Sequence, residues 1–187
     1  MTRVLAALAL VCLLAGCGAQ HHAAPTTTSA GDGFAIAPPT PAPSFLLPDQ
    51  DGTPVGPQRY RGRWVAITFL YTHCPDVCPL IADQLAAAER RDGRLHVIAV
   101  SVDPKRDTRA AVKRFLARHH AGPRFQYVTG TPAALSHVWR DYHIAALPGP
   151  SGTVSHSAFT LLVDPQGRER ELFDSHITAR AVLAALG

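Results

Sequence analysis

The chain has 187 residues, of which 47% are hydrophobic and 17% are charged. This balance is typical of one globular domain and excludes a fibrous or wholly disordered chain. The formal net charge is +4, but no run of basic residues is longer than Arg90-Arg91. Because nucleic-acid binding needs clustered basic residues, we expect no nucleic-acid partner.

The N-terminal segment MTRVLAALALVCLLAGC combines Arg3 with an apolar run and ends in small residues and Cys17. This pattern predicts an export signal, because the apolar run is shorter than the about 20 residues of a membrane-spanning helix. Residues 13–17, LLAGC, resemble a bacterial lipobox, in which cleavage leaves a lipidated cysteine. We therefore expect residues 1–17 to be a lipoprotein signal peptide with its lipobox cysteine. Cys17 would then anchor the protein by lipid to the outer face of the bacterial cytoplasmic membrane; a secretory signal cut near Ala19 is the alternative.

Residues 18–43 are rich in Ala, Thr, Pro, Ser and Gly and lack hydrophobic periodicity, which predicts a flexible tether. Cys12 would leave with the signal and Cys17 would carry lipid, so only Cys74 and Cys78 would remain as thiols in the folded domain. Export would place this pair in an oxidising compartment, where nearby thiols form a disulfide unless a metal or a reductant holds them.

The domain proper is expected at residues 44–187, with helical and strand periods alternating along it. In chain order, the predicted elements are a hairpin at 44–55, strand 63–71, helix 80–90, strand 95–102, helix 108–118, strand 125–128, a helix from 131, a loop at 145–153, strands 158–163 and 170–173, and helix 177–186. Thr108 is expected to cap one helix, and Pro132 to stand at the first position of another. The order βαβ followed by ββα predicts an α/β, thioredoxin-like fold with an N-terminal β-hairpin and an added helical unit.

Cys74 and Cys78 lie between a predicted strand and the next helix, in the segment FLYTHCPDVCPL. Ligands bind at this end of open α/β sheets, and a helix N-terminus favours a thiolate, which is both a nucleophile and a metal ligand. We expect Pro79 near the first helical position and an irregular turn from Cys74 to Cys78. The pair could then be a redox pair, part of a metal site, or a structural disulfide that closes a very short and weakly stabilising loop.

A tight soft-metal site needs a third ligand besides two thiolates, and the chain offers 10 histidines. Sequence position alone does not choose among them. His156 follows a flexible loop and precedes a predicted strand, so it could reach the end of the sheet where the cysteines lie.

Four segments resemble, in this order, the Sco/SenC family of copper-binding assembly factors for cytochrome c oxidase: FLYTHCPDVCPL, AVSVDPKRDT, VTGTP and SHSAFTLLVDPQGR. The resemblance implies a thioredoxin-like domain that binds one copper ion, Cu(I) or Cu(II), through Cys74, Cys78 and His156. It also implies that the protein helps to build the dinuclear copper centre of the oxidase. Its partner would be the copper-receiving oxidase subunit, and no upstream copper donor is indicated.

Two positions near the implied ligands bear on this resemblance. Ser155 stands where the family commonly has Asp, so a carboxylate that would orient the site or balance its charge is missing. Asp76 matches the acidic residue between the family's cysteines. It could act in metal or partner handling, or cap a backbone N–H of the turn.

The resemblance implies a membrane-tethered extracytoplasmic copper chaperone, a metallochaperone rather than an enzyme. Two soft thiolates and an imidazole suit that task, because such ligands favour copper. The main alternative is a thiol-disulfide oxidoreductase that uses Cys74 and Cys78 on oxidase subunit cysteines. Such enzymes usually carry C-x-x-C, and this chain has one residue more between the cysteines. Zinc would fit the same ligands together with water, but the sequence shows neither a general base nor a substrate pocket for zinc catalysis. A peroxidase would need a separate activated cysteine, and the sequence offers no candidate.

Overall fold

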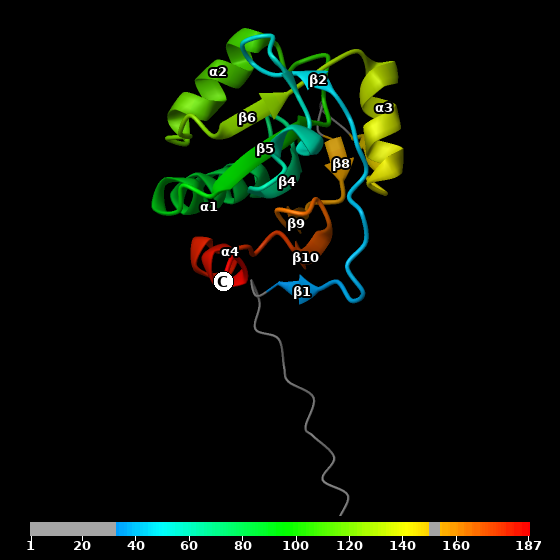
Figure 1. The fold of residues 1–187 in the computed structure, drawn as a ribbon. Helices are drawn as coiled ribbons and strands as arrows, with labels where there is room; N and C mark the ends of the chain where they lie inside the picture. Colours follow the sequence, from blue (N-terminus) through cyan, green and yellow to red (C-terminus); the bar gives the residue numbers. More distant parts are fainter. Residues whose placement is uncertain (1–32, 150–153) are drawn as a thin grey trace, which may run out of the picture.

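The computed structural model describes residues 33–149 and 154–187. Its centre is a mixed sheet in the strand order β1-β10-β9-β4-β5-β6 (Figure 1). The strands of this sheet are β1 (Phe34–Ala35), β4 (Trp64–Leu70), β5 (Leu95–Ser101), β6 (Phe125–Val128), β9 (Thr160–Val163) and β10 (Glu169–Phe173). Strands β4, β5 and β6 are parallel, whereas β9, β10 and β1 each run antiparallel to their neighbours. The mixed α/β architecture expected from the sequence is confirmed.

Helices cover both faces of the sheet, with α1, α2 and α4 on one side and α3 on the other (Figure 1). The helices are η1 (Pro57–Tyr60), a 3-10 turn, and α1 (Val77–Arg91), α2 (Arg109–Arg118), α3 (Pro132–Asp141) and α4 (Ala179–Ala185). Six of the seven residues of β4 are buried, which explains its nearly continuous apolar sequence. No helix in the described part of the chain is long and apolar enough to cross a membrane.

Local signals at the helix starts behave as predicted. The side chain of Thr108 accepts a hydrogen bond from the Ala111 N–H, and that of Thr131 accepts one from the Ala134 N–H. Pro132 is the first residue of α3, where its missing N–H costs nothing. These caps fix where α2 and α3 begin, and so where the loops before them meet the sheet.

The boundary between tether and domain is a correction. Residues 33–43 were expected to belong to the tether, but β1 pairs with β10, and the Ile36 N–H donates to the Arg170 carbonyl at 2.8 Å. The paired strand β1 has only two residues and its partner β10 is far away in the sequence, so no local hydrophobic period predicts the pairing. The remainder of the predicted tether, with His21-His22, and the predicted signal segment with Cys17 lie outside the described residues.

The predicted hairpin at residues 44–55 is confirmed in shorter form by β2 (Leu47–Pro48) and β3 (Pro54–Val55). The prediction of a loop at residues 145–153 needs correction. Its described residues include β7 (Ala146–Pro148), which pairs with β8 (Val154–His156). In this second hairpin Ala146 lies opposite His156. His156 therefore ends a strand rather than following a free loop.

The predicted start of the first long helix, residue 80, also needs correction. Helix α1 begins at Val77 and already contains Cys78 and Pro79. The first four N–H groups of a helix have no partner within it, so proline in the first turn loses no hydrogen bond. The irregular turn is thus shorter than predicted. It ends at Asp76, which precedes the helix with φ −127° and ψ −105°.

Candidate metal centre

The turn that carries Cys74 leaves the sheet at the carboxyl end of β4. The Cys74 N–H donates to the Tyr71 carbonyl at 3.2 Å, which turns the chain back toward the start of α1. Cys74 is partly exposed, whereas Cys78, in the first turn of α1, is fully buried. Both are free thiols. One sulfur atom therefore faces solvent and the other faces the core.

The two thiols are electrostatically different because they share one hydrogen bond. Cys78 donates to Cys74, and the backbone N–H groups of Asp76 and Cys78 also donate to the Cys74 sulfur, which lowers the pKa of Cys74 to about 5. The same sulfur–sulfur bond, together with burial, raises the pKa of Cys78 well above its ordinary value. These opposite shifts favour the thiolate at Cys74 and the thiol at Cys78.

His156 lies beside Cys78 although 78 residues separate them in the chain, with its Nε2 atom 3.7 Å from Cys78 Sγ. Its Nδ1 atom is 3.1 Å from the Ser157 carbonyl oxygen, which can only accept a hydrogen bond. Nδ1 therefore carries the proton, and Nε2 presents its lone pair toward the sulfur. Burial lowers the pKa of His156, which favours the neutral imidazole that a metal requires.

Tyr71 holds the β7–β8 hairpin against the cysteine turn. Its ring packs edge-on to the His156 ring, with centroids 5.8 Å apart and planes at 81°. Its hydroxyl oxygen accepts a hydrogen bond from the Val154 N–H at 3.4 Å. Tyr71 therefore contacts both ends of β8 and fixes where the imidazole lies.

Asp107 lies under the cysteine turn and was not singled out in the sequence analysis, where it appears only within the segment AVSVDPKRDT. It is 1% exposed. Its Oδ1 accepts bonds from the Thr72 N–H and hydroxyl at 2.9 and 2.8 Å. Its Oδ2 accepts from Ser101 Oγ at 2.6 Å and from the Tyr127 hydroxyl at 2.9 Å. An acidic residue at the carboxyl end of a buried strand was the available signal.

The three predicted ligands are adjacent through Cys78, which contacts Cys74 on one side and His156 on the other. Among residues 33–149 and 154–187, however, no three His, Cys, Asp or Glu side chains are already arranged to hold a metal ion. Metal binding would thus require the side chains to move closer together. The donor set itself, two sulfurs and an imidazole with its lone pair aimed at one of them, fits a soft metal.

Asp76 is exposed and makes no side-chain capping bond to α1. The alternative in which its carboxylate caps a backbone N–H is therefore wrong for this structure. Ser155 is also exposed and lies opposite Leu147 in the β7–β8 hairpin.

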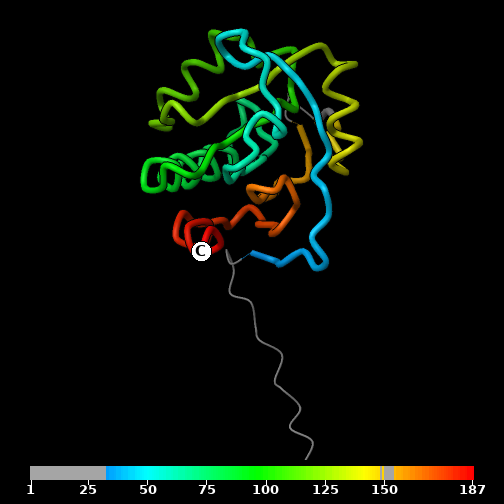
Figure 2. The backbone as a smooth tube through the Cα atoms, viewed as in Figure 1, coloured from blue at the N-terminus to red at the C-terminus, as the bar shows by residue number. Residues whose placement is uncertain are grey.

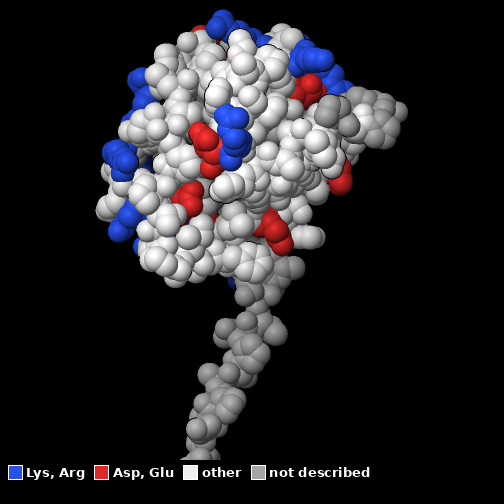
Figure 3. All heavy atoms as spheres, turned by 90° about the vertical axis from the view of Figure 1, so that its right-hand side faces the viewer, with Lys and Arg blue, Asp and Glu red and all other residues white. Residues whose placement is uncertain are grey.

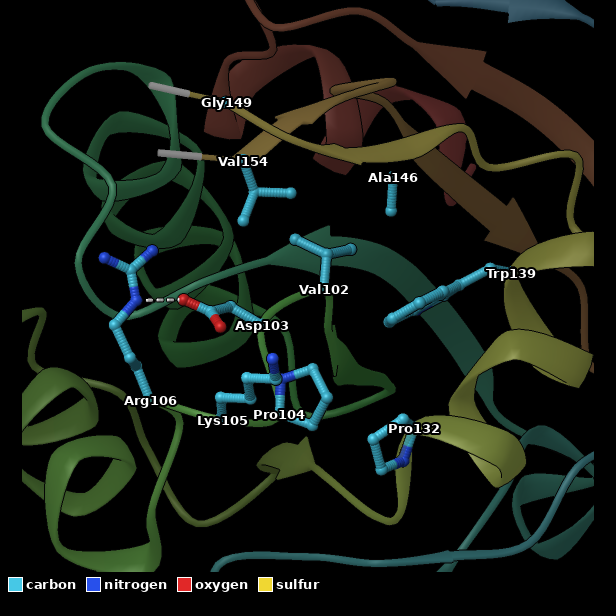
Figure 4. A pocket seen from close by; sticks show the side chains of 10 residues that line it. All are labelled: Val102, Asp103, Pro104, Lys105, Arg106, Pro132, Trp139, Ala146, Gly149 and Val154. Atoms are coloured by element: carbon cyan, nitrogen blue, oxygen red, sulfur yellow. Dashed lines mark hydrogen bonds and ion pairs between the residues drawn. The ribbon is translucent and has the colours of Figure 1, made fainter. Parts of the chain in front are cut away.

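An apolar pocket of about 420 Å³ lies beside the site, between α3 and the β7–β8 hairpin. Figure 4 shows the Trp139 ring and the Val102 and Val154 side chains on its walls, and the ion pair between Arg106 and Asp103 near one end. Its described lining includes no cysteine or histidine. Since Val154 belongs to β8, the pocket shares a wall with the hairpin that carries His156.

The sequence model of the SCO1/SenC family matches residues 36–187, nearly the whole described part of the chain. The chain belongs to the SCO1/SenC family. The family inferred from the four segments is thereby confirmed, and the predicted thioredoxin-like fold is that of its solved members.

Relatives with known names place the chain within this family. It is 29% identical over 153 residues to the mitochondrial SCO2 homolog of Mus musculus, covering 76% of this chain and 59% of that protein. It spans only 49% of the mouse SCO1 homolog, so it corresponds to about half the length of these curated relatives.

Solved Sco structures with copper bound share the fold. ScoI of Bradyrhizobium japonicum with copper bound is 33% identical, with a TM-score of 0.65 over 79% of this chain and 98% of that one. ScoI of Arabidopsis thaliana with copper bound is 27% identical, with a TM-score of 0.68 over 76% of this chain and 93% of that one.

Proposed function

We propose that this protein is a membrane-tethered extracytoplasmic copper chaperone that binds one copper ion through Cys74, Cys78 and His156. Copper is its cargo rather than a resident cofactor. In this proposal it passes the ion to the copper-receiving subunit of cytochrome c oxidase and so assists assembly of the dinuclear copper centre. Lipid on Cys17 would hold it at the outer face of the bacterial cytoplasmic membrane.

The observation that carries the proposal is the 3.7 Å contact between Cys78 Sγ and His156 Nε2, with Cys74 hydrogen-bonded to the same sulfur. Two soft sulfur ligands and an imidazole select copper over hard cations. Copper bound to Sco proteins of the same fold supports this choice of metal.

The exposure of the site suits transfer by ligand exchange. Cys74 is partly exposed and ionised, so an incoming ion meets this thiolate first, while Cys78 and His156 receive it from the protein side. Cys78 must lose its proton to bind the ion, and this proton is released to solvent, because Cys74 must remain a thiolate to hold the metal. A three-ligand site leaves a position at which a partner's ligand can enter and take the ion.

The test is copper titration of the purified full chain with His156→Ala. If His156 is the third ligand, its loss should weaken copper binding by more than tenfold, about 1.4 kcal/mol, and should prevent oxidase assembly in cells. His176→Ala is the matched control, because His176 is exposed and lies far along the chain, beside Asp174. Undiminished copper affinity in His156→Ala would remove His156 from the ligand set.

The second candidate is a thiol-disulfide oxidoreductase acting on oxidase subunit cysteines, favoured by the partly exposed, ionised Cys74 beside a buried Cys78 thiol. This activity needs only the cysteine pair. Reduction of a model disulfide should therefore survive His156→Ala while copper binding is lost. If instead assembly survives in His156→Ala but fails in Cys74→Ser, the oxidoreductase becomes the better account.

A further inference from the structure

A second, polar pocket of about 360 Å³ lies between the turn that carries Cys74 and helix α2. It shares no lining residue with the apolar pocket of Figure 4. Its lining residues are Thr72, His73, Cys74, Ala111, Arg114 and Arg118. Its volume lies at the lower end of the range of about 300–1,000 Å³ typical of small-molecule sites.

Two arginines from one face of α2 give this pocket its charge. Arg114 and Arg118 are four residues apart, a spacing that puts two side chains on the same side of a helix. Both are exposed, and within the described part of the chain neither makes a hydrogen bond or an ion pair. Their neighbour Lys113, by contrast, is paired with Asp51 at 2.7 Å.

None of the described residues that line the pocket is acidic, so no lining carboxylate neutralises these arginines. The buried carboxylate of Asp107 hydrogen-bonds Thr72 behind the lining, and its two oxygens already accept four bonds. The face of the molecule over α3 differs, because there acidic and basic side chains are scattered among uncharged ones (Figure 3). The pocket is thus a local positive site beside a sulfur atom.

Among the described lining residues Cys74 alone carries sulfur, and Cys78 is fully buried beside it. We propose that the pocket binds small disulfides that carry carboxylates, with a carboxylate at Arg114 and Arg118 and the disulfide at Cys74 Sγ. Arginine suits this role because its planar guanidinium donates paired hydrogen bonds to a carboxylate. The inference concerns the metal-free cysteine pair and does not depend on copper transfer.

The reaction at this site is thiol–disulfide exchange in two steps. Cys74 sulfur attacks one sulfur of the bound disulfide, forms a mixed disulfide and releases the other half of the small molecule as a thiolate. Cys78 sulfur then attacks Cys74 Sγ, forms the Cys74–Cys78 disulfide and releases the second half. The dithiol loses two protons and two electrons, and the small disulfide gains them as two thiols.

The experiment measures the rate at which the reduced, metal-free full chain is oxidised by three disulfides. Glutathione disulfide carries net negative charge, bis(2-hydroxyethyl) disulfide is uncharged, and cystamine is positively charged. In the double variant Arg114→Gln, Arg118→Gln, we expect the rate with glutathione disulfide to fall about fivefold, the combined effect of two exposed ion pairs. The rate with the uncharged disulfide should stay within about twofold, because it carries no charge for the arginines to attract. The rate with cystamine should rise, because the variant removes two positive charges that repel this cation.

The matched control is the double variant Arg91→Gln, Arg180→Gln. It removes the same net charge from α1 and α4, at exposed arginines that do not line the pocket. Arg91 lies 13 residues after Cys78, about 20 Å away along the helix. The proposal is overturned if the pocket variant leaves the glutathione disulfide rate unchanged, lowers all three rates alike, or does no more than this control.

Discussion

Cys74 and Cys78 carry the same thiol group in opposite surroundings. Four hydrogen-bond donors converge on the Cys74 sulfur: the Cys78 S–H, the Asp76 and Cys78 N–H groups and the Tyr71 hydroxyl. Cys78, by contrast, is buried and keeps its proton in the bond to Cys74. Since the thiolate is the reactive form, nucleophilic reactivity should belong to Cys74 alone. The sequence indicated a thiolate at a helix N-terminus, but it could not say which of the two cysteines would carry it.

We predict that iodoacetamide alkylates Cys74 with a rate that rises as pH passes through about 5, where this thiol loses its proton. Below that pH the thiol is protonated and the reaction should slow. Cys78→Ala removes the S–H donor, so the midpoint of the profile should move upward, toward the ordinary cysteine value of about 8.5. Mass spectrometry of the alkylated, metal-free protein identifies the site. A wild-type midpoint near the ordinary value, or the same midpoint in Cys78→Ala, would contradict this assignment.

At the scale of elements, Asp107 joins the ends of the three parallel strands. Its carboxylate bonds Thr72 after β4, Ser101 at the end of β5 and Tyr127 in β6. The Tyr127 hydroxyl also lies 3.0 Å from the Leu70 carbonyl. This network fixes Thr72, and so the turn that presents Cys74, relative to the sheet.

We predict that Asp107→Ala lowers the free energy of unfolding by about 3 kcal/mol, because it leaves several buried donors without an acceptor. Asp107→Asn keeps one oxygen and should cost less. Asp83→Ala is the control on the surface. Asp83 is half exposed and, within the described part of the chain, is paired with His119 alone, so its loss should cost at most about 1 kcal/mol. Urea unfolding measures all three; equal losses in Asp107→Ala and Asp83→Ala would show that the network does not stabilise the fold.

The sequence predicted an element correctly where neighbouring residues determine it, and missed an element where distant residues determine it. Thr108 was predicted correctly as a cap, and Pro132 as the first residue of α3, since a helix start is decided within a few residues. The β7–β8 hairpin was missed because its pairing brings Ala146 to His156 through a Pro- and Gly-rich segment that reads as a loop. His156 itself was found by resemblance to a family, because the fold alone brings it to Cys78.

At the scale of the whole molecule, the N-terminal segment crosses the fold rather than hanging from it. Figure 2 shows it running from the β1 edge past α3 to the hairpin near β6. Along this path the Tyr142 hydroxyl donates to the Pro43 carbonyl at 2.6 Å, and the Thr129 N–H donates to the Pro48 carbonyl at 3.0 Å. The domain therefore includes residues from Phe34 onward, and a change upstream of residue 33 removes none of these contacts.

This separation makes the anchor testable without disturbing the fold. We predict that Cys17→Ala leaves the domain folded and releases the protein from the membrane fraction, because several lipid chains on one cysteine hold firmly whereas the apolar run alone is too short to span. Cys12→Ala is the matched control. Cys12 lies within the predicted signal and would leave with it, so this variant should stay with the membrane. Fractionation of cells and circular dichroism of the released protein measure the two outcomes. If Cys17→Ala stays with the membrane as firmly as Cys12→Ala, the lipobox cysteine is not the anchor.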